Sequence, residues 1–280
     1  MKTVSEIEEL RQLRRRWRGA GERVALVPTM GNLHAGHLAL VERARQLADR
    51  VVVSIFVNPA QFDRADDLAA YPRTPEADRA KLAAAGVACL FAPEASTLYP
   101  DGGLATRVEV PGISEILEGA SRPGHFTGVA TVVCKLFHLV EPELAIFGEK
   151  DFQQLLLIRR MVADLDMAIE VESLPTVREA DGLAMSSRNN RLGTAERKLA
   201  GGLYQTLRET AAALADHHDD YPALQRSARE KLAARGFKPD YVEIRRRRDL
   251  ASPTAGERQL VILAAAWLGD VRLIDNLTLG

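Results

Sequence analysis

Residues 24–40 read VALVPTMGNLHAGHLAL and contain an apolar run at 24–29, which predicts a strand, then a loop and the start of a helical pattern. The helical spacing begins near Gly36 and extends to about residue 48. A second apolar run, VVVSIFV at 51–57, follows it. Both runs are continuous instead of alternating, which is typical of parallel strands that helices cover on both faces. The stretch therefore predicts a βαβ unit and a doubly wound α/β fold.

The same alternation of strand and helix patterns continues through the first 175 residues. Residues 1–19 carry acids early and arginines late, as an amphipathic helix does, and they lack the apolar segment of a signal peptide. We therefore expect this region to form one domain that starts with a helix. Its further predicted helices follow Pro75 and cover 128–140 and 151–165, and its further predicted strands cover 87–92, 144–148 and 168–174.

The pattern changes after residue 175, where a polar loop leads into Ala-rich helical sequence. No Gly/Ser-rich or Pro-rich linker separates the two regions. We therefore predict two domains: a Rossmann-like doubly wound parallel sheet in 1–175 and a smaller α+β C-terminal domain in 176–280. The second domain has predicted helices at 194–217 and 221–235 and predicted strands at 240–246, 258–269 and 271–277.

Composition excludes several classes of protein. The 280 residues contain 37 Lys and Arg against 38 Asp and Glu, so the net charge of -1 favours neither a nucleic-acid nor an anionic-membrane partner. No stretch has the roughly 18 to 20 uncharged apolar residues of a membrane span, and we expect a cytoplasmic protein. The two cysteines, Cys89 and Cys134, lie far apart in apolar segments, which indicates core positions instead of a disulfide framework.

The loop at 27–35 leaves the carboxyl end of the first predicted strand, and two histidines lie at its end and just after it. Ligands bind at this end in doubly wound sheets. His34 and His37 would lie at a helix N-terminus, where unpaired N–H groups and the helix dipole attract phosphate. Two alternatives stay open, namely that the histidines are helix caps or that they bind zinc with His125 as a third ligand. The segment by itself favours a site for nucleotide phosphates.

Polar residues also follow other predicted strands. Asn58 and Gln61 come after the run at 51–57, and Glu149, Lys150, Asp151, Gln153 and Gln154 come after the run at 144–148. A lysine can neutralise phosphate charge, and amides can bind a carboxylate or a hydroxyl. The loop AMSSRNN at 184–190 adds hydroxyls, successive N–H groups and an arginine, which together suit phosphate binding. A solvated helix end and a linker are the structural alternatives.

Taken together, these segments resemble the pantothenate synthetase (pantoate–β-alanine ligase) family. This family belongs to a nucleotidylyltransferase superfamily that shares the HxGH signature with class I aminoacyl-tRNA synthetases. HxGH alone is a weak signal, but the ordered combination of motifs across 28–277 is specific. The motifs are PTMGNLHAGHLAL, FVNPAQF, YPRT, RPGHFTGVATVVCKLF, FGEKDFQQL, MSSRN and RLIDNL.

The resemblance implies a two-step ligation. Pantoate attacks the α-phosphorus of ATP to give pantoyl adenylate and pyrophosphate, and β-alanine then displaces AMP to give pantothenate. The resemblance further implies Mg²⁺, a homodimer and a C-terminal domain that acts as a lid. His37 is the expected proton donor, and His34 and Lys150 are further catalytic residues that supply positive charge. No nucleophilic side chain is required.

The resemblance also assigns the binding residues. Gln61 and Gln154 would bind pantoate, and Gln61 would also bind β-alanine. The loop at 185–188 would take the part of the KMSKS loop in the synthetases. The residues expected to bind ATP are Met30, Gly31, Asn32, Leu33, His34, Ala35, Gly36, His37, Gly148, Glu149, Lys150, Asp151, Val177, Met185, Ser186, Ser187 and Arg188.

Other functions remain as alternatives. Another HxGH enzyme would adenylylate or cytidylylate a different small acid, but the two motifs that supply Gln61 and Gln154 argue against it. An RNA-binding relative of the synthetases would carry a basic appended domain, which this near-neutral chain lacks. A catalytically inactive paralogue would have lost some of these polar groups. One departure from the family is Asn190 and Arg191, because an aromatic residue commonly lies two positions after SSRN.

Overall fold

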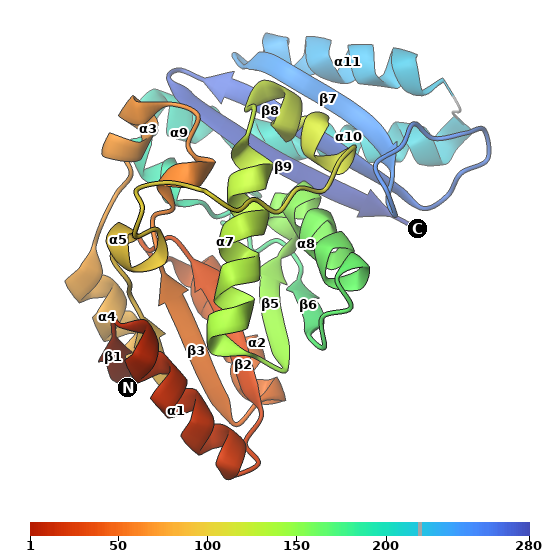
Figure 1. Cartoon of the computed structure of the whole chain (residues 1–280). Coiled ribbons are helices and arrows are strands. Elements are labelled where there is room, and N and C mark those ends of the chain that lie inside the picture. The colour runs from red at the N-terminus through yellow and green to blue at the C-terminus, as the bar shows by residue number, and fades with distance from the viewer. Residues whose placement is uncertain (218–219) are drawn as a thin grey trace. The chain divides into compact units, whose positions relative to one another are not determined.

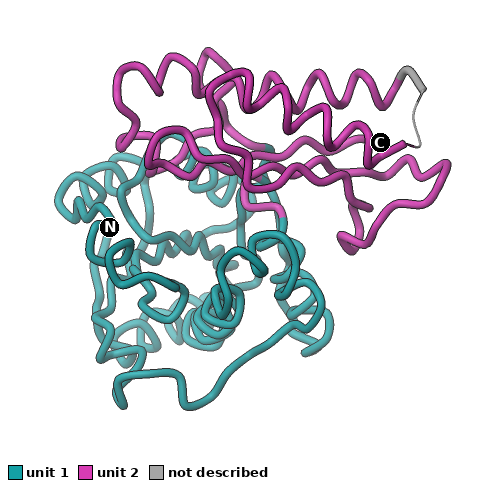
Figure 2. The backbone as a smooth tube through the Cα atoms, turned by 90° about the horizontal axis from the view of Figure 1, so that it is seen from above, with its two compact units in different colours: residues 1–149, 153–175 teal, residues 150–152, 176–280 magenta. Residues whose placement is uncertain are grey.

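A computed structural model describes residues 1–217 and 220–280. The chain forms two compact units (Figure 2). Unit 1 comprises residues 1–149 and 153–175, and unit 2 comprises residues 150–152 and 176–280. The short segment Lys150–Phe152 therefore groups with the C-terminal part of the chain, although it lies between two stretches of unit 1.

Unit 1 contains a parallel sheet of six strands in the order β1-β4-β3-β2-β5-β6. The order runs outward from β2 in one direction and from β5 in the other, so β2 and β5 flank the topological switch point, beside which such folds bind ligands. This sheet confirms the predicted fold class. The strands are β1 (Lys2–Val4), β2 (Val24–Thr29), β3 (Arg50–Ile55), β4 (Cys89–Phe91), β5 (Leu144–Gly148) and β6 (Glu170–Leu174).

Helices cover both faces of this sheet (Figure 1). One face carries α1 (Ile7–Gly19), α7 (His125–Val140) and α8 (Phe152–Asp164), and the other carries α2 (Ala35–Leu47) and α4 (Pro75–Ala84). Successive residues of β2 serve opposite cores: Val24 and Leu26 pack with the first set of helices, and Ala25 and Val27 with the second. Burial on both faces explains why the strand sequences are continuous apolar runs. The remaining short helices are η1 (Pro59–Gln61), α3 (Ala65–Ala69), α5 (Ala95–Leu98), η2 (Ile113–Glu115), α6 (Glu118–Ser121) and η3 (Glu149–Asp151).

The N-terminus differs from the prediction of a helix over residues 1–19. Lys2–Val4 forms strand β1, which pairs in parallel with β4 at the edge of the sheet, and α1 begins only at Ile7. Val4 pairs with Phe91 and is 1% exposed. The prediction was wrong here because three residues are too short for a strand period to show in the sequence.

Unit 2 contains a three-stranded antiparallel sheet, and helices α10 and α11 pack against it. The single helix predicted over 194–217 is divided at residues 200–201. A Cβ atom at Gly201 would lie 2.6 Å from the carbonyl oxygen of Asp181, so the backbone at this break packs closely against another segment. The elements are η4 (Ser187–Arg191), α9 (Thr194–Leu199), α10 (Gly202–His217), α11 (Tyr221–Ala234), β7 (Lys238–Arg246), β8 (Leu260–Leu268) and β9 (Val271–Leu279).

Two further expectations concern burial. Cys89 lies in the core of unit 1, as predicted, whereas Cys134 is only partly buried on α7 and is not a full core residue. Within residues 1–217 and 220–280, the helices are too short or too polar to cross a membrane.

Candidate functional site

The two histidines of the HxGH segment form a reciprocal cap at the start of α2. His34 is the N-cap residue, and its Nδ1 accepts from the N–H of Gly36 at 3.2 Å. The Nδ1 of His37 accepts in turn from the N–H of His34 at 3.3 Å, and the ring centroids are 4.0 Å apart. A neutral imidazole that accepts at Nδ1 carries its proton on Nε2. Capping therefore fixes the tautomer of both rings and leaves Nε2–H as the donor of each.

The loop before this cap is held by a buried aspartate of α4. The two carboxylate oxygens of Asp78 accept from the N–H groups of Asn32 and Leu33, each at 2.8 Å. Lys81, one turn further along α4, donates to the carbonyl oxygen of Leu33 at 2.6 Å. Asp78 is 1% exposed. Two N–H groups expected near ATP are therefore bonded to an internal carboxylate.

Sequence reasoning missed Asp78, although a signal for it exists. Asp78 lies four residues before Leu82, so both project from the same side of α4. Leu82 is fully buried in the core. An acid on the apolar side of a helix is uncommon unless it has partners, and this pattern could have identified the residue.

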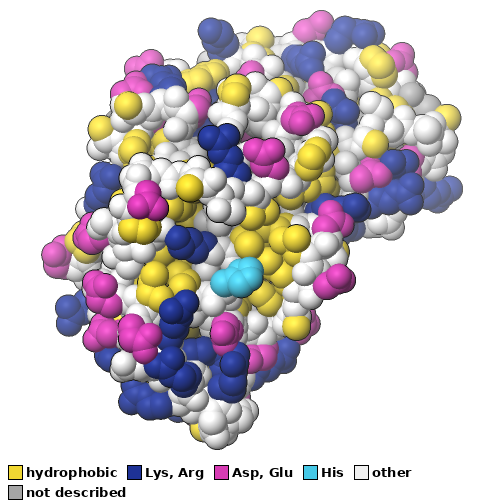
Figure 3. Space-filling view, viewed as in Figure 1, with side chains coloured by type: hydrophobic (Ala, Val, Ile, Leu, Met, Phe, Trp, Pro, Cys, Tyr) yellow, Lys and Arg dark blue, Asp and Glu magenta, His cyan; other side chains and the backbone are white. Residues whose placement is uncertain are grey.

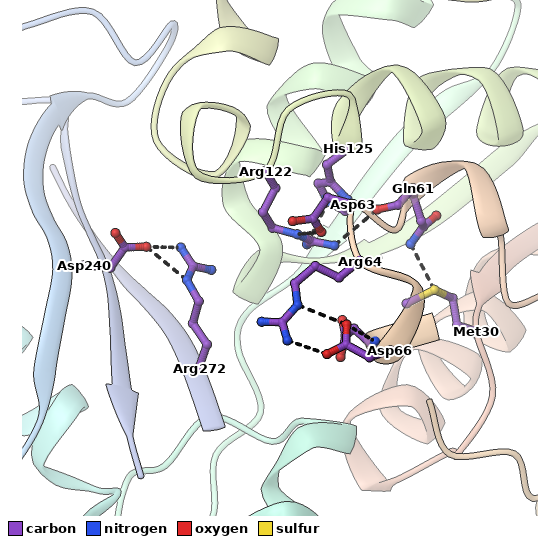
Figure 4. Close-up of polar contacts among 10 residues, drawn as sticks. Met30, Gln61, Asp63, Arg64, Asp66, Arg122, His125, Asp240 and Arg272 are labelled. Atoms are coloured by element: carbon purple, nitrogen blue, oxygen red, sulfur yellow. Dashed lines mark hydrogen bonds and ion pairs between the residues drawn. The ribbon is translucent and has the colours of Figure 1, made fainter. Parts of the chain in front are cut away.

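Met30 and Gln61 come from the loops after β2 and β3, and the fold brings them together (Figure 4). The amide nitrogen of Gln61 lies 2.9 Å from the sulfur of Met30, and its amide oxygen accepts from Asn58 at 3.1 Å. Gln61 is 8% exposed and Asn58 is 1% exposed. Asn58 is thus a buried support for Gln61 at the carboxyl edge of the sheet.

His125 and Arg122 hold the backbone of the same loop (Figure 4). The carbonyl oxygen of Gln61 accepts from Nδ1 of His125 at 2.8 Å and from Arg122 at 3.2 Å. Nε2 of His125 lies 3.3 Å from the Arg122 guanidinium. His125 therefore supports Gln61 and is not drawn toward the other two histidines as a third ligand. Among the described residues, no group of three His, Cys, Asp or Glu side chains is arranged to hold a metal ion.

Helix α7 approaches this loop so closely that only glycine fits at position 128. A Cβ atom at Gly128 would lie 2.3 Å from the carbonyl oxygen of Ala60. The carbonyl oxygen of Gly128 accepts from Asn58 at 3.1 Å, and the hydroxyl of Tyr99 donates to Asn58 at 2.9 Å. Burial raises the pKa of Tyr99 to about 12, so this hydroxyl remains a donor at neutral pH. These contacts explain the glycine of the HFTGV motif.

Two adjacent glutamines, Gln153 and Gln154, follow the carboxyl end of β5 and differ in their contacts and burial. The amide of Gln153 donates to the carbonyl oxygens of Ile113 and Ile116 at 2.7 and 2.8 Å and accepts from Glu118 N–H at 3.2 Å. Gln153 is 3% exposed, whereas Gln154 is only partly buried. Gln153 therefore fixes a loop of unit 1, and Gln154 is the more exposed of the two side chains.

Gly148 and Glu149 end β5 and begin η3 in unit 1. A carboxylate oxygen of Glu149 accepts from the hydroxyl of Ser173 at 2.9 Å, and the Ser173 hydroxyl oxygen lies 3.1 Å from a donor nitrogen of Arg159. The side chain of Glu149 is thereby directed along the end of β6. In unit 2, Lys150 and Asp151 form a loose ion pair at 3.6 Å.

The predicted segment at 177–188 folds within unit 2 as a tight turn followed by η4. The N–H of Met185 donates to the carbonyl oxygen of Val177 at 3.0 Å. The hydroxyl of Ser186 accepts from the N–H of Arg188 at 3.2 Å and caps η4. Ser187 is mostly buried, and the unusual residues Asn190 and Arg191 lie within η4. The departure from the family pattern therefore does not prevent this turn.

Arg178, next to Val177, is a second residue that sequence reasoning missed. Its guanidinium donates to both carboxylate oxygens of Asp275, at 2.7 and 2.9 Å, and lies 3.6 Å from the centroid of the Tyr204 ring. Burial raises the pKa of the Asp275 carboxyl, and the adjacent guanidinium opposes that increase. The RLIDNL motif, which contains Asp275, signalled the region without indicating its role.

A cavity of about 730 Å³ lies in unit 1 but is not lined by any predicted site residue. Its walls include Pro59 and Ala60 of η1, together with Tyr99, Arg107 and Thr127. It adjoins the loop that carries Gln61 from the side of α5 and α7.

Comparison with known proteins gives concordant matches over the whole chain. The family model described as pantoate-beta-alanine ligase matches residues 2–278. A pantothenate synthetase of Thioalkalivibrio sulfidiphilus is 64% identical over 262 residues, which cover 93% of this chain and 92% of that protein. A crystal structure of pantothenate synthetase from Thermus thermophilus aligns with a TM-score of 0.91 and 48% identity over 99% of both chains. A pantoate-beta-alanine ligase from Francisella tularensis, complexed with β-γ ATP and β-alanine, aligns with a TM-score of 0.85 and 35% identity over 99% of this chain and 97% of that one.

Proposed function

Because the chain belongs to the pantoate-beta-alanine ligase family, we propose how its residues carry out the ATP-dependent formation of pantothenate from pantoate and β-alanine. In the first step a pantoate carboxylate oxygen bonds to the α-phosphorus of ATP, and pyrophosphate leaves. In the second step the β-alanine amine attacks the acyl carbon of the adenylate, AMP leaves, and the amine loses a proton. Pantothenate, AMP and pyrophosphate are the products.

His34 and His37 are proposed to bind the phosphates of ATP, with His37 as the proton donor. The observation that carries this assignment is their reciprocal cap, which fixes an Nε2–H donor on each ring at the N-terminus of α2. A helix N-terminus favours bound phosphate, and the two donors would stabilise the charge that develops as pyrophosphate departs. The surrounding stretch Met30–Gly36 is also proposed to contact ATP.

Gln61 and Gln154 are proposed to bind pantoate, and Gln61 also β-alanine. The burial and the bonds of Gln153 support this choice, because they leave Gln154 as the partly exposed amide after β5. Gln61 is held by Asn58 and by the contacts of Arg122 and His125 to its backbone, so its position is fixed before substrate binds. Orientation of two reactants can lower the activation barrier by roughly 7 to 11 kcal/mol, so the uncharged amides of Gln61 and Gln154 can contribute to catalysis by holding the substrates in place.

The remaining ATP contacts are proposed from both units. Gly148 ends β5 and Glu149 begins η3 in unit 1, whereas Lys150, Asp151, Val177 and the loop Met185–Arg188 belong to unit 2. Lys150 and Arg188 supply the positive charge that an attacking carboxylate needs when it meets a triphosphate. The expectation that residues 176–280 act as a lid remains a prediction.

Mg²⁺ is proposed as the ion that accompanies ATP. Mg²⁺ loses its water reluctantly and commonly binds through substrate phosphates, so we propose that phosphate oxygens and water hold most of its coordination positions. When bound, Mg²⁺ would neutralise part of the triphosphate charge.

We also propose a homodimer in the cytoplasm, where ATP is available. On the face of unit 1 shown in Figure 3, hydrophobic side chains gather around α7. Leu104, Val108 and Cys134 are among the apolar residues near α7 that are only partly buried. Light scattering should give twice the chain mass of 30.7 kDa, and Val108→Asp should shift the protein toward the monomer. A monomeric parent protein would contradict this proposal.

The central test is pantoate-dependent exchange of labelled pyrophosphate into ATP without β-alanine. The adenylate mechanism predicts exchange with pantoate and little with other hydroxy acids. His37→Ala should lower the exchange rate by about 100-fold or more, because it removes a donor to the transition state. His138→Ala replaces an exposed histidine of α7 and serves as the matched control. Absence of exchange in the parent protein, or normal exchange in His37→Ala, would refute the mechanism or the role of His37, respectively.

Gln154→Ala tests the pantoate clamp separately. The KM for pantoate should rise by about 10-fold or more, while the KM for ATP changes little, because the amide is proposed to contact the acid and not the nucleotide. Gln205→Ala, at an exposed position of α10, is the control. Equal increases of both KM values would remove Gln154 from this role.

A further inference from the structure

Strand β9 holds two segments of unit 2 that are distant in the sequence. Asp275 accepts from the guanidinium of Arg178, 97 residues away. The side-chain amide of Asn276 donates to the carbonyl oxygen of Lys150 at 2.9 Å, 126 residues away. Asp275 is 3% exposed and Asn276 is 5% exposed, so both side chains are buried, whereas their partners are partly exposed. Two consecutive residues of one strand therefore bind two separate segments.

The alternation of side chains along a strand explains how neighbours can do this. Val271 and Leu273 pack in the core of unit 2, and Asp275 shares their side of β9 because it lies at the same two-residue spacing. Asn276 projects to the opposite side. Among the strands that the structure describes, β9 is at the edge of its sheet and pairs only with β8. The strand thus presents a carboxylate on one side and an amide on the other.

Arg178 connects Asp275 to the loop that follows Val177. Besides its two bonds to Asp275, it donates to the carbonyl oxygens of Gly182 at 3.0 Å and Asn276 at 3.3 Å, and it stacks on the ring of Tyr204. The turn that starts at Val177 is therefore fixed against β9 on several sides. The loop that follows this turn contains Met185–Arg188, which is proposed to contact ATP.

We propose that Asp275 and Asn276 are positioning residues of the ATP site. Within unit 2 they fix the distance between the segment of Lys150 and the segment Val177–Arg188. The inference rests on the proposed function, because that function assigns both segments to ATP. Segments that are already fixed lose less conformational entropy when the nucleotide binds. A misplacement of about 1 Å can cost roughly 100-fold in rate, so the effect of losing this support is measurable.

Asn276→Asp tests the amide of this pair, because it keeps the shape of the side chain and replaces the donor with an acceptor. We expect the KM for ATP in pantoate-dependent pyrophosphate exchange to rise by about 10- to 100-fold, with a smaller change in the KM for pantoate. Asn276→Ala removes the donor without adding charge and should show the same pattern. If Asn276 had only a structural role, the variants would be less stable, but both KM values would stay unchanged well below the unfolding temperature.

A double-mutant cycle distinguishes positioning from a general structural role. If Asn276 acts through Lys150, Asn276→Ala should add less than about 2-fold in a Lys150→Ala background. Full additivity of the two effects would contradict the inference. Thr210→Val is the control, since it removes a buried hydroxyl of α10 that bonds to Thr206 and should leave both KM values unchanged.

The same cycle separates the inference from the proposed function. Normal exchange in Lys150→Ala would show that Lys150 does not serve ATP, and the proposed function would then fail at that residue. Impaired exchange in Lys150→Ala, together with unchanged ATP kinetics in both Asn276 variants, would overturn the positioning role alone. Impairment in all three variants with non-additive effects is the expected result.

Discussion

Each unit holds one segment of the proposed site with a buried aspartate, but the two carboxylates bind different partners. In unit 1, Asp78 accepts from the adjacent backbone N–H groups of Asn32 and Leu33. In unit 2, Asp275 accepts from the guanidinium of Arg178. Asp78 is 1% exposed and Asp275 is 3% exposed, so burial alone does not distinguish them.

The difference teaches what each kind of contact can fix. A carboxylate that accepts from the backbone determines the path of one short loop, whichever side chains the loop carries. A carboxylate that accepts from a guanidinium depends on a particular arginine, but the long side chain lets it hold a segment from a distance. Unit 1 therefore shapes a loop directly, whereas unit 2 connects segments through side chains.

The largest effect is expected for Asp275→Ala in unit 2. Removal of the carboxylate leaves the Arg178 guanidinium, whose side chain is 17% exposed, without its bidentate partner. The free energy of unfolding should fall by about 3 to 5 kcal/mol. Urea denaturation in a Trp17→Phe background measures it, because Trp267 is then the only tryptophan and lies in unit 2. A loss below about 1 kcal/mol would mean that the guanidinium does not depend on this carboxylate.

Gly128→Ala should give the next largest loss, and it probes the direct packing of unit 1. The added methyl group would lie 2.3 Å from the carbonyl oxygen of Ala60, so backbone must move. We expect a cost of about 3 kcal/mol, at the upper end of typical overpacking, and a raised KM for pantoate through the shifted Gln61. Gly19→Ala is the control, because nothing lies within 4 Å of its added Cβ. Equal stability of the two variants would contradict the close approach.

Asp78→Asn should cost about 2 kcal/mol, less than the loss of Asp275, because the amide keeps one acceptor for the loop and turns an NH₂ group toward the other backbone N–H. That backbone donor is left unsatisfied. Because this loop precedes His34, the KM for ATP should rise as well. Steady-state kinetics with ATP varied checks this expectation, and Asp78→Glu should restore part of the loss if carboxylate acceptors are what matters. Unchanged ATP kinetics would limit Asp78 to a purely structural role.

Thiol labelling gives the smallest effect and reports on unit 1 alone, because both cysteines of the chain lie there. Burial raises the pKa of the Cys89 thiol to about 12, so almost no thiolate forms at about pH 8. Cys134 is only partly buried and should react first. Mass spectrometry should show faster labelling of Cys89 in Asp78→Asn than in the parent protein, and no acceleration in Asp275→Ala. Equal acceleration in both variants would show that the two units open together.

Local patterns account for the parts of the fold that could be predicted. The strands at 24–29 and 144–148 match their predicted ranges, since an apolar run buried on both faces is visible in the sequence itself. Strand β1 and the break between α9 and α10 were missed, because each depends on a partner elsewhere in the chain. A hydrophobic periodicity can be recognised only over several residues, and the three-residue strand and the two-residue break are both too short for this.

By itself the sequence determined the parallel sheet, the histidines at a helix N-terminus and the family, because short-range periodicity and ordered motifs carry that information. Only the tertiary structure decided which of the two neighbouring glutamines, Gln153 or Gln154, has a structural role, and which aspartates hold the segments of the proposed site. Gln153 bonds to residues 113–118, Asp78 to residues 32–33, and Asp275 to Arg178. These partners lie about 35 to 97 positions away, and no local pattern encodes a contact that chain folding alone creates.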